Sequence, residues 1–189
     1  MKVINNRVWS HNSSQTGKKE YPSEVAISPP KIIYKFQELV KEMALIAYNN
    51  PERTLFFRGQ DKEYKRMYVK STKTVNGTCI YPTIFRELID RKTNVDIFND
   101  RISRFRQAET LLLNLLNEYK IEYIDKLNKF AEIRWAILQH YEVCSTPLID
   151  ITSSLRVASV FALKKGTPTG IVYILGLPNI NDSISYYVE

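Results

Sequence analysis

The chain has 189 residues, of which 44% are hydrophobic and 25% are charged, so it is long enough to fold around an apolar core as one domain. No apolar run approaches the roughly 18 residues of a membrane-spanning helix, and the opening MKVINNRVWS lacks the apolar segment of a secretory signal. The net charge of +7 favours partners that carry phosphate groups, although a positive surface also serves solubility alone.

The cysteine content indicates the compartment and argues against a metal centre. Cys79 and Cys144 lie far apart and have no motif spacing, so neither a disulfide framework nor a zinc site is expected. We therefore expect a cytoplasmic protein with no membrane segment and no bound metal.

The first part of the chain is predicted to contain an arm, a helix and a strand. Residues 1–29 are rich in Ser, Asn, Lys and Pro and are expected to form a flexible N-terminal arm, with a single domain over residues 30–189. Apolar residues recur at helical spacing over residues 31–50, which predicts a helix. TLFFR, residues 54–58, predicts a short buried strand, and Asn76-Gly77 predicts a turn in the lysine-rich stretch after it.

The rest of the chain is predicted to be mainly helical, with strands near its end. The predicted helices span residues 81–92, 98–119, 122–141 and 153 or 154 to 163. The predicted strands are PLIDIT, residues 147–152, and GIVYILGL, residues 170–177. Asn99 or Asp100 is the expected N-cap of the second of these helices, and Lys164-Lys165-Gly166 closes the last. This order of elements indicates the α+β class.

Arg58 stands where an apolar strand ends, which raises the question of what its charge meets. Along the strand Thr54, Phe56 and Arg58 share one face. One interpretation is a buried ion pair, with Asp150 as the natural partner. The other is that the guanidinium group binds a phosphate or a ribose hydroxyl. Gly59 either supplies a turn or lets a ligand approach the backbone.

A second cluster lies where PLIDIT meets the following helix. Asp150 and Thr152 share a face of the expected strand, and the N-terminus of the helix offers N–H groups suited to a phosphate or carboxylate. The simpler alternative is that Ser153 or Ser154 only caps the helix. His140, at the end of another predicted helix, is more often a capping or core residue than a catalyst.

Three motifs in this order resemble the FRG domain family, named for its Phe-Arg-Gly signature. They are FFRGQ, YPTIFR and QHYEVCSTPLIDITSSLRVASVFAL, which together cover most of residues 54–175. The matching residues are Arg58, Gly59, Gln60, Pro82, Phe85, Arg86, His140, Asp150, Thr152, Ala158, Phe161 and Ala162. The chain departs from the family pattern at Glu142, where a glycine is usual, and at Ile151, where a tryptophan is usual.

The layout of the family is also similar to that of ADP-ribosyltransferases, and this likeness implies a fold and a cofactor. It implies a split fold that binds NAD as co-substrate, with a small mixed sheet and a helical subdomain inserted between the strand of Arg58 and the segment Thr152-Ser153-Ser154. Arg58 would then hold an NAD phosphate or ribose, and Tyr81 or Tyr141 would stack on the nicotinamide ring. The residues implied to bind NAD are Arg58, Gly59, Gln60, Tyr81, Asp150, Thr152, Ser153 and Phe161.

The resemblance also implies a catalytic glutamate on a later strand, which orients the nicotinamide ribose. The candidate catalytic residues are Glu189, Glu142 and His140. Chains of the family usually continue past the strand that contains Ile-Val-Tyr, and this one ends at SYYVE. We therefore keep three explanations open: a fragment that lacks its C-terminal segment, a subunit completed by another chain, or an inactive relative.

Two functions from different classes follow from these observations. The first is an NAD-binding, ADP-ribosyltransferase-like protein, a toxin or phage-defence effector that modifies a macromolecule, with nucleic acid favoured by the positive charge. The second is a non-catalytic FRG recognition module that binds nucleic acid or a partner protein such as an antitoxin. An NAD hydrolase and a nuclease are further alternatives, but the carboxylate cluster that a metal-dependent nuclease needs is not found around the motifs.

Overall fold

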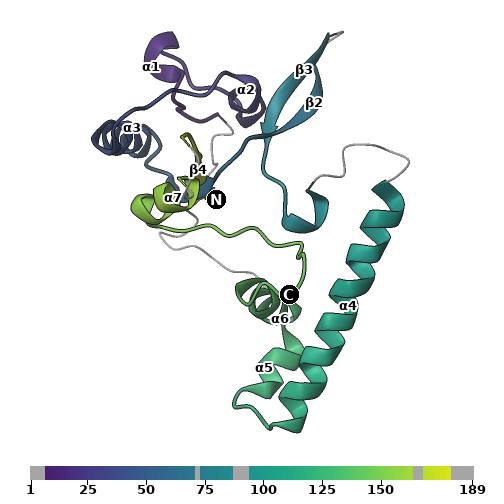
Figure 1. Cartoon of the computed structure of the whole chain (residues 1–189). Helices are drawn as coiled ribbons and strands as arrows, with labels where there is room; N and C mark the ends of the chain where they lie inside the picture. Colours follow the sequence, from purple (N-terminus) through teal and green to yellow (C-terminus); the bar gives the residue numbers. More distant parts are fainter. Residues whose placement is uncertain (1–6, 71–72, 87–93, 164–167, 180–189) are drawn as a thin grey trace, which may run out of the picture. The chain divides into compact units, whose positions relative to one another are not determined.

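A computed structural model describes residues 7–70, 73–86, 94–163 and 168–179. The chain divides into two compact units, Ile80–Ile149 and a unit made from Met1–Cys79 together with Asp150–Glu189. In sequence, the mainly helical second unit is thus inserted between the two halves of the first (Figure 1). Both helices and strands are present, which confirms the α+β class. The strands in the described ranges pair only in antiparallel fashion, so the expected mixed sheet is wrong. The likeness to ADP-ribosyltransferases stays a prediction.

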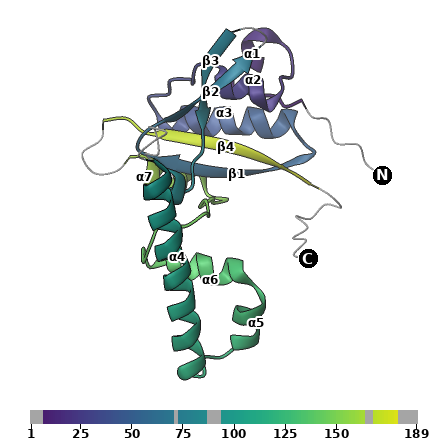
Figure 2. The same cartoon turned by 90° about the vertical axis from the view of Figure 1, so that its right-hand side faces the viewer.

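The first unit contains two antiparallel pairs of strands and four helices. Its helices are α1 (Ser13–Thr16), α2 (Pro22–Ile27), α3 (Phe36–Asn49) and α7 (Leu155–Ala162). Its strands are β1 (Arg53–Gln60), β2 (Tyr64–Lys70), β3 (Lys73–Cys79) and β4 (Ile171–Pro178). β1 pairs with β4, and β2 pairs with β3 (Figure 2). The predicted strands at TLFFR and GIVYILGL are confirmed.

The core of the first unit forms where α7 and α3 pack on the β1–β4 pair. Phe57, Leu155 and Ala158 are buried there, and Leu39 and Met43 of α3 pack against them. Because side chains alternate along a strand, β1 gives Phe57 to this core and turns Arg58 to the other face. The strand therefore buries an apolar face and a polar face at the same time, since Phe57 and Arg58 are both less than a tenth exposed.

The lysine-rich stretch after β1 is a hairpin, so the turn expected at Asn76-Gly77 is wrong. Both residues lie within β3, where Asn76 pairs with Met67 and Gly77 pairs with Arg66. The Asn-Gly signal was overridden by the longer alternation of β-branched and polar residues around it. The helix predicted over residues 31–50 is present but begins only at Phe36, after two prolines and an extended stretch.

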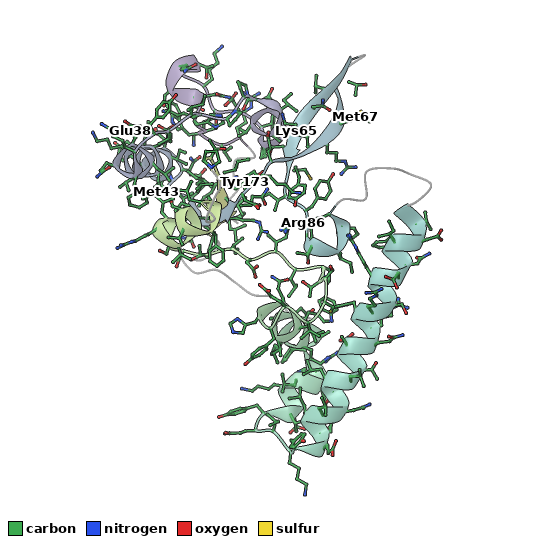
Figure 3. All side chains as sticks on the ribbon, in the orientation of Figure 1. Glu38, Met43, Lys65, Met67, Arg86 and Tyr173 are labelled. Atoms are coloured by element: carbon green, nitrogen blue, oxygen red, sulfur yellow. The ribbon has the colours of Figure 1, made fainter. Side chains whose placement is uncertain are left out.

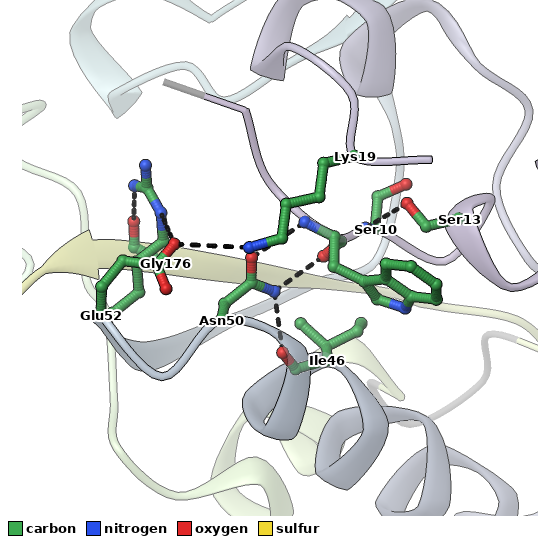
Figure 4. A network of polar contacts seen from close by, with 9 residues as sticks. Ser10, Ser13, Lys19, Ile46, Asn50, Glu52 and Gly176 are labelled. Atoms are coloured by element: carbon green, nitrogen blue, oxygen red, sulfur yellow. Dashed lines mark hydrogen bonds and ion pairs between the residues drawn. The ribbon is translucent and has the colours of Figure 1, made fainter. Parts of the chain in front are cut away.

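The segment predicted as an N-terminal arm contains α1 and α2 and is joined to the end of α3 by one buried side chain. Asn50, which is 2% exposed, accepts a hydrogen bond from the backbone N–H of Trp9 (2.8 Å) and donates to the carbonyl oxygens of Trp9 (2.9 Å) and Ile46 (2.8 Å) (Figure 4). An asparagine amide can do this because it carries both a donor and an acceptor. The flexibility of the arm and the expected single domain over residues 30–189 stay predictions.

The second unit consists of a 3-10 turn, η1 (Thr83–Phe85), and helices α4 (Asn94–Glu118), α5 (Ile124–Lys129) and α6 (Ala131–His140). Ile84, Phe105 and Leu138 form its buried core. The predicted helix over residues 81–92 is only the 3-10 turn in the part that is described, and residues 87–93 lie outside it. Asn99 and Asp100 are not N-caps, because α4 already begins at Asn94.

The single helix predicted over residues 122–141 is instead two helices that break at Phe130. Arg134 is 9% exposed and donates from Nη1 to the carbonyl oxygen of Asn128 at 3.1 Å, beside a further bond to Leu127. The same guanidinium group binds Oε1 of Glu109 at 2.7 Å. The buried arginine thus satisfies the carbonyls at the end of α5, which makes the break stable. No helix in the described ranges is both long and apolar enough to span a bilayer.

Candidate functional site

Arg58 is held against the segment that leads into α7. Its side chain is buried, at 8% exposure, and Nη1 donates a hydrogen bond of 2.7 Å to the backbone carbonyl oxygen of Asp150. Nε lies 3.4 Å from Oε1 of Gln60, which is two residues further along β1 and therefore on the same face. The first and third sequence motifs, far apart in the chain, meet at this guanidinium group.

Tyr173 completes this polar face, and the sequence analysis did not identify it. It lies directly opposite Arg58 in the β1–β4 register. Its hydroxyl accepts a hydrogen bond from Nε2 of Gln60 at 3.1 Å and lies 3.1 Å from Oγ1 of Thr78 on β3. The single polar ring within the apolar run GIVYILGL was the signal that could have identified it.

The environment of Tyr173 keeps its phenol neutral. Burial raises the pKa of Tyr173 above its ordinary value of 10.0, and this outweighs the opposing effect of the hydrogen bond with Thr78. The negative charge of Glu63 raises the pKa further, whereas the positive charge of Arg58 lowers it. The face can therefore offer a neutral hydroxyl next to a fixed cation.

The segment predicted as the strand PLIDIT does not form a strand in the structure. Its one ladder contact is a bridge between Thr152 and Phe57, in which each residue donates its N–H to the carbonyl of the other, at 2.8 and 2.7 Å. Pro147 has no N–H to donate to a ladder, and α7 begins at Leu155, so little of the segment can extend the pairing. The bridge nevertheless fixes Thr152 beside β1, one residue from Arg58.

The start of α7 is capped by a serine, and the structure decides which one. Oγ of Ser154 accepts a hydrogen bond from the N–H of Val157 at 3.3 Å, while Oγ1 of Thr152 accepts from the N–H of Ser154 at 3.0 Å. Ser154 is therefore the N-cap, as one of the two alternatives predicted. Ser153 and Asp150 have exposed side chains next to this cap.

Position 59 requires a glycine because the backbone of α7 packs directly against it, and not because the chain turns there. A Cβ atom placed there would lie 1.7 Å from the carbonyl oxygen of Ala158 and 2.7 Å from the backbone nitrogen of Ala162. The glycine lies within β1, so the turn interpretation is wrong. Whether Gly59 also contacts NAD stays a prediction. Phe161, another residue implied to bind NAD, lies on α7 with 61% of its surface exposed.

Three of the predicted site residues belong to the second unit. Tyr81 is partly buried, and its carbonyl oxygen accepts a hydrogen bond from Nε of Arg86 at 3.2 Å. His140 is exposed at the end of α6, where its ring meets the ring of Tyr141 edge to face at 5.1 Å. Glu142 follows in the loop, and its side chain is also exposed.

Glu142 occupies the backbone position that ends α6. Its φ is 51°, in the left-handed region, and its N–H donates to the carbonyl of Gln139 at 3.0 Å. The N–H of Val143 donates to the carbonyl of Leu138, also at 3.0 Å. These two bonds form a Schellman motif, whose left-handed residue is usually glycine. The third catalytic candidate, Glu189, lies outside the described residues.

In the described part of the chain, no group of three or more His, Cys, Asp or Glu side chains is arranged to hold a metal ion. The polar face instead combines one buried guanidinium group, an amide and a neutral phenol, next to the capped N-terminus of α7. Such a set of donors suits an anionic or hydroxylated ligand rather than a cation.

The fold and this face define an α+β protein in which a strand-end Arg-Gly-Gln is joined to the entry of a later helix. Residues 53–169, more than half of the chain, match the FRG domain, and the chain belongs to the FRG domain family. The matched range begins with β1 and ends after α7, so it contains both halves of the contact between Arg58 and Asp150. No curated protein and no solved structure matches the chain.

Proposed function

We propose that the chain binds NAD in the manner of an ADP-ribosyltransferase, with Arg58 contacting a phosphate or ribose hydroxyl. The observation that carries the proposal is the 2.7 Å hydrogen bond between Arg58 and the carbonyl of Asp150. This bond holds a fixed positive charge beside the exposed side chains of Asp150 and Ser153 and beside the N-terminus of α7. A cation and a helix N-terminus that lie together favour a phosphate group.

In this proposal the surrounding residues have distinct roles. Gln60 and Tyr173 hold the guanidinium group in place through the hydrogen bonds that link them. Thr152 and Ser153 shape the nicotinamide pocket, and Phe161 supplies an apolar wall.

The acceptor and the biological role are further parts of the same proposal. ADP-ribose would be transferred to a macromolecule, with nucleic acid favoured by the net charge of +7, and the protein would act as a toxin or a phage-defence effector. Glu189, Glu142 and His140 are the candidates for the group that stabilises the oxocarbenium-like transition state. If water is the acceptor, the same site would hydrolyse NAD.

Calorimetry with NAD, together with an assay for nicotinamide release, tests the proposal. The Arg58→Ala variant is expected to bind NAD roughly ten- to a hundredfold more weakly, the range for one charge-assisted hydrogen bond. Arg53→Ala is the matched control, because it removes the same charge from the opposite end of β1, where Nη1 donates to the carbonyl of Gly176. A folded Arg58→Ala variant that binds NAD as the unaltered chain does would refute the role given to Arg58.

A second candidate function is a recognition module without catalysis, and one observation favours it. Arg58 is buried, and its described bonds go to groups of the protein itself, which is what a purely structural arginine also shows. Absence of saturable NAD binding by the unaltered, folded chain at millimolar NAD would favour this function. Nicotinamide release would exclude it.

A further inference from the structure

The β2–β3 hairpin is a basic two-stranded ribbon. Its strands pair with each other and with no other strand in the described ranges. Residues 61–79 contain five Lys or Arg residues and two acidic residues, which gives this segment an excess of positive charge. Figures 1 and 2 show the ribbon extending away from the β1–β4 pair within the first unit.

One face of the ribbon carries exposed side chains of the kinds that contact base edges. Lys65 pairs with Thr78 in the register, and Met67 pairs with Asn76, so these side chains share a face. The side chain of Lys65 is 60% exposed, with Nζ 3.3 Å from Oε2 of Glu63; Met67 is 70% exposed, and Asn76 is exposed as well. Figure 3 labels Lys65 and Met67 on the hairpin. Arg66 is exposed and belongs to the opposite face, beside Gly77.

We propose that this ribbon binds double-stranded DNA by entering the major groove. The major groove of B-form DNA is wide enough for a two-stranded ribbon. Lysine can donate to guanine, asparagine can bind adenine through two hydrogen bonds, and an apolar side chain can contact the methyl group of thymine. Lys65, Asn76 and Met67 offer these three contacts from one face of the ribbon. Arg66 lies on the other face, from which it can contact the phosphates.

The details of the hairpin favour duplex DNA over other nucleic acids. The deep, narrow major groove of double-stranded RNA does not admit such a ribbon. A single-strand binder stacks bases on exposed aromatic rings. Tyr64, the aromatic residue of the hairpin whose side chain the structure describes, is half-buried, with the ammonium group of Lys62 placed 5.2 Å from the centre of its ring.

This inference names a surface for the nucleic-acid partner and does not require NAD binding. The test is fluorescence anisotropy of the full chain, without NAD, on a labelled duplex of about two helical turns at about 100 mM salt. The double variant Lys65→Ala, Arg66→Ala is expected to bind roughly tenfold more weakly. When the titration is repeated over a series of salt concentrations, its salt slope should be lower by about one, because Arg66 is the residue that contacts phosphate. Lys126→Ala, Lys129→Ala is the matched control, since it removes the same charge from exposed positions on α5.

Each contrary outcome of this titration is decisive. If the two double variants lose the same amount of affinity for the duplex, net charge alone drives binding, and the proposal is overturned. Equal or tighter binding to the single strand or to an RNA duplex would also overturn it, as would no binding by the unaltered chain. Because NAD is absent, none of these results bears on the role of Arg58 in binding NAD.

A photocrosslinking experiment keeps the proposal testable if the alanine variants fold poorly. A benzoyl-phenylalanine placed at Met67 is expected to crosslink to duplex DNA. The control is the same group at Val160 on α7, which is 67% exposed and therefore matches Met67 closely in exposure. Crosslinking that is equal at the two positions, or absent at Met67, would contradict docking through the ribbon.

Discussion

Arg58 and Asp150 are 92 residues apart in the sequence and are joined by a 2.7 Å hydrogen bond from a guanidinium nitrogen to a backbone carbonyl oxygen. The bond uses the main chain of Asp150, so it fixes the course of the segment before α7 whatever else the carboxylate contacts. It links β1 to the part of the chain that returns after the inserted helical unit. The two halves of the first unit are thereby held together by a polar contact as well as by Phe57 and Leu155.

The Arg58→Ala variant is expected to lower the free energy of unfolding by about 2 kcal/mol, because a buried, charge-assisted hydrogen bond is lost. Arg58→Lys should recover part of this, since an ammonium group can reach the carbonyl but cannot also present the guanidinium fork to Gln60. Urea denaturation monitored by circular dichroism measures both. Equal stability of Arg58→Ala and the unaltered chain would show that the contact contributes nothing to folding.

Gly59→Ala should be severely destabilising, by roughly 3 kcal/mol or more, because the new Cβ would overlap backbone atoms of α7 that cannot move independently. Gly176→Ala on β4 is the matched control: there the nearest atom is Cδ of Arg53 at 3.0 Å, and a flexible side chain can shift. Thermal melts of the two variants compare them directly. Similar melting temperatures would mean that α7 does not lie this close to β1.

The sequence was sufficient to predict the elements whose apolar pattern is long and continuous. The strands at TLFFR and GIVYILGL and the helices around residues 36–49 and 155–162 all have such patterns, and each is present. The predicted strand PLIDIT is wrong although its apolar alternation is real, because the segment shares only one bridge with β1, at Phe57. The periodicity of a segment indicates which of its faces is apolar. It does not indicate whether a neighbouring strand will pair with that segment along its length.

The polar face was predictable in part. Arg58 was identified because a charge interrupts an apolar run, and contact with Asp150 was one of its two interpretations. That interpretation named the carboxylate, and the structure adds a bond to the backbone carbonyl. Tyr173 was missed because a tyrosine in a strand is usually an ordinary core residue. Its role depends on the register between β1 and β4. This register is set by tertiary packing and cannot be predicted from the sequence of either strand alone.

Glu142→Gly is expected to stabilise the protein by about 1 kcal/mol, because glycine adopts the left-handed backbone of the Schellman motif without steric cost. Glu142→Ala removes the same carboxylate but keeps the strained backbone, so it should be no more stable than the unaltered chain. Denaturation measures the stability, and nicotinamide release by the same variants tests the catalytic candidate. If release is present and both variants abolish it, Glu142 is catalytic; if both retain it, the residue serves only the end of α6.

Tyr173→Phe is expected to have two separable effects. At neutral pH it removes the hydroxyl that accepts from Gln60 and contacts Thr78, which should cost about 1 kcal/mol. The raised pKa of Tyr173 adds a dependence on pH with a defined sign. Since the unfolded chain ionises this phenol first, the stability linked to the neutral phenol is fully present below pH 10.0 and is lost as the pH rises through the folded pKa.

The measurement is urea denaturation of the unaltered chain and the Tyr173→Phe variant between neutral pH and the onset of alkaline unfolding. The other tyrosines and the lysines contribute equally to the free energy of unfolding of both proteins. The difference between the two free energies at each pH therefore reports on Tyr173 alone. It should be constant up to the ordinary tyrosine pKa and shrink above it, because only the unaltered chain loses stability from this group. A difference that stays constant, or that grows with pH, would mean that the phenol is not held neutral by burial between β1, β3 and β4.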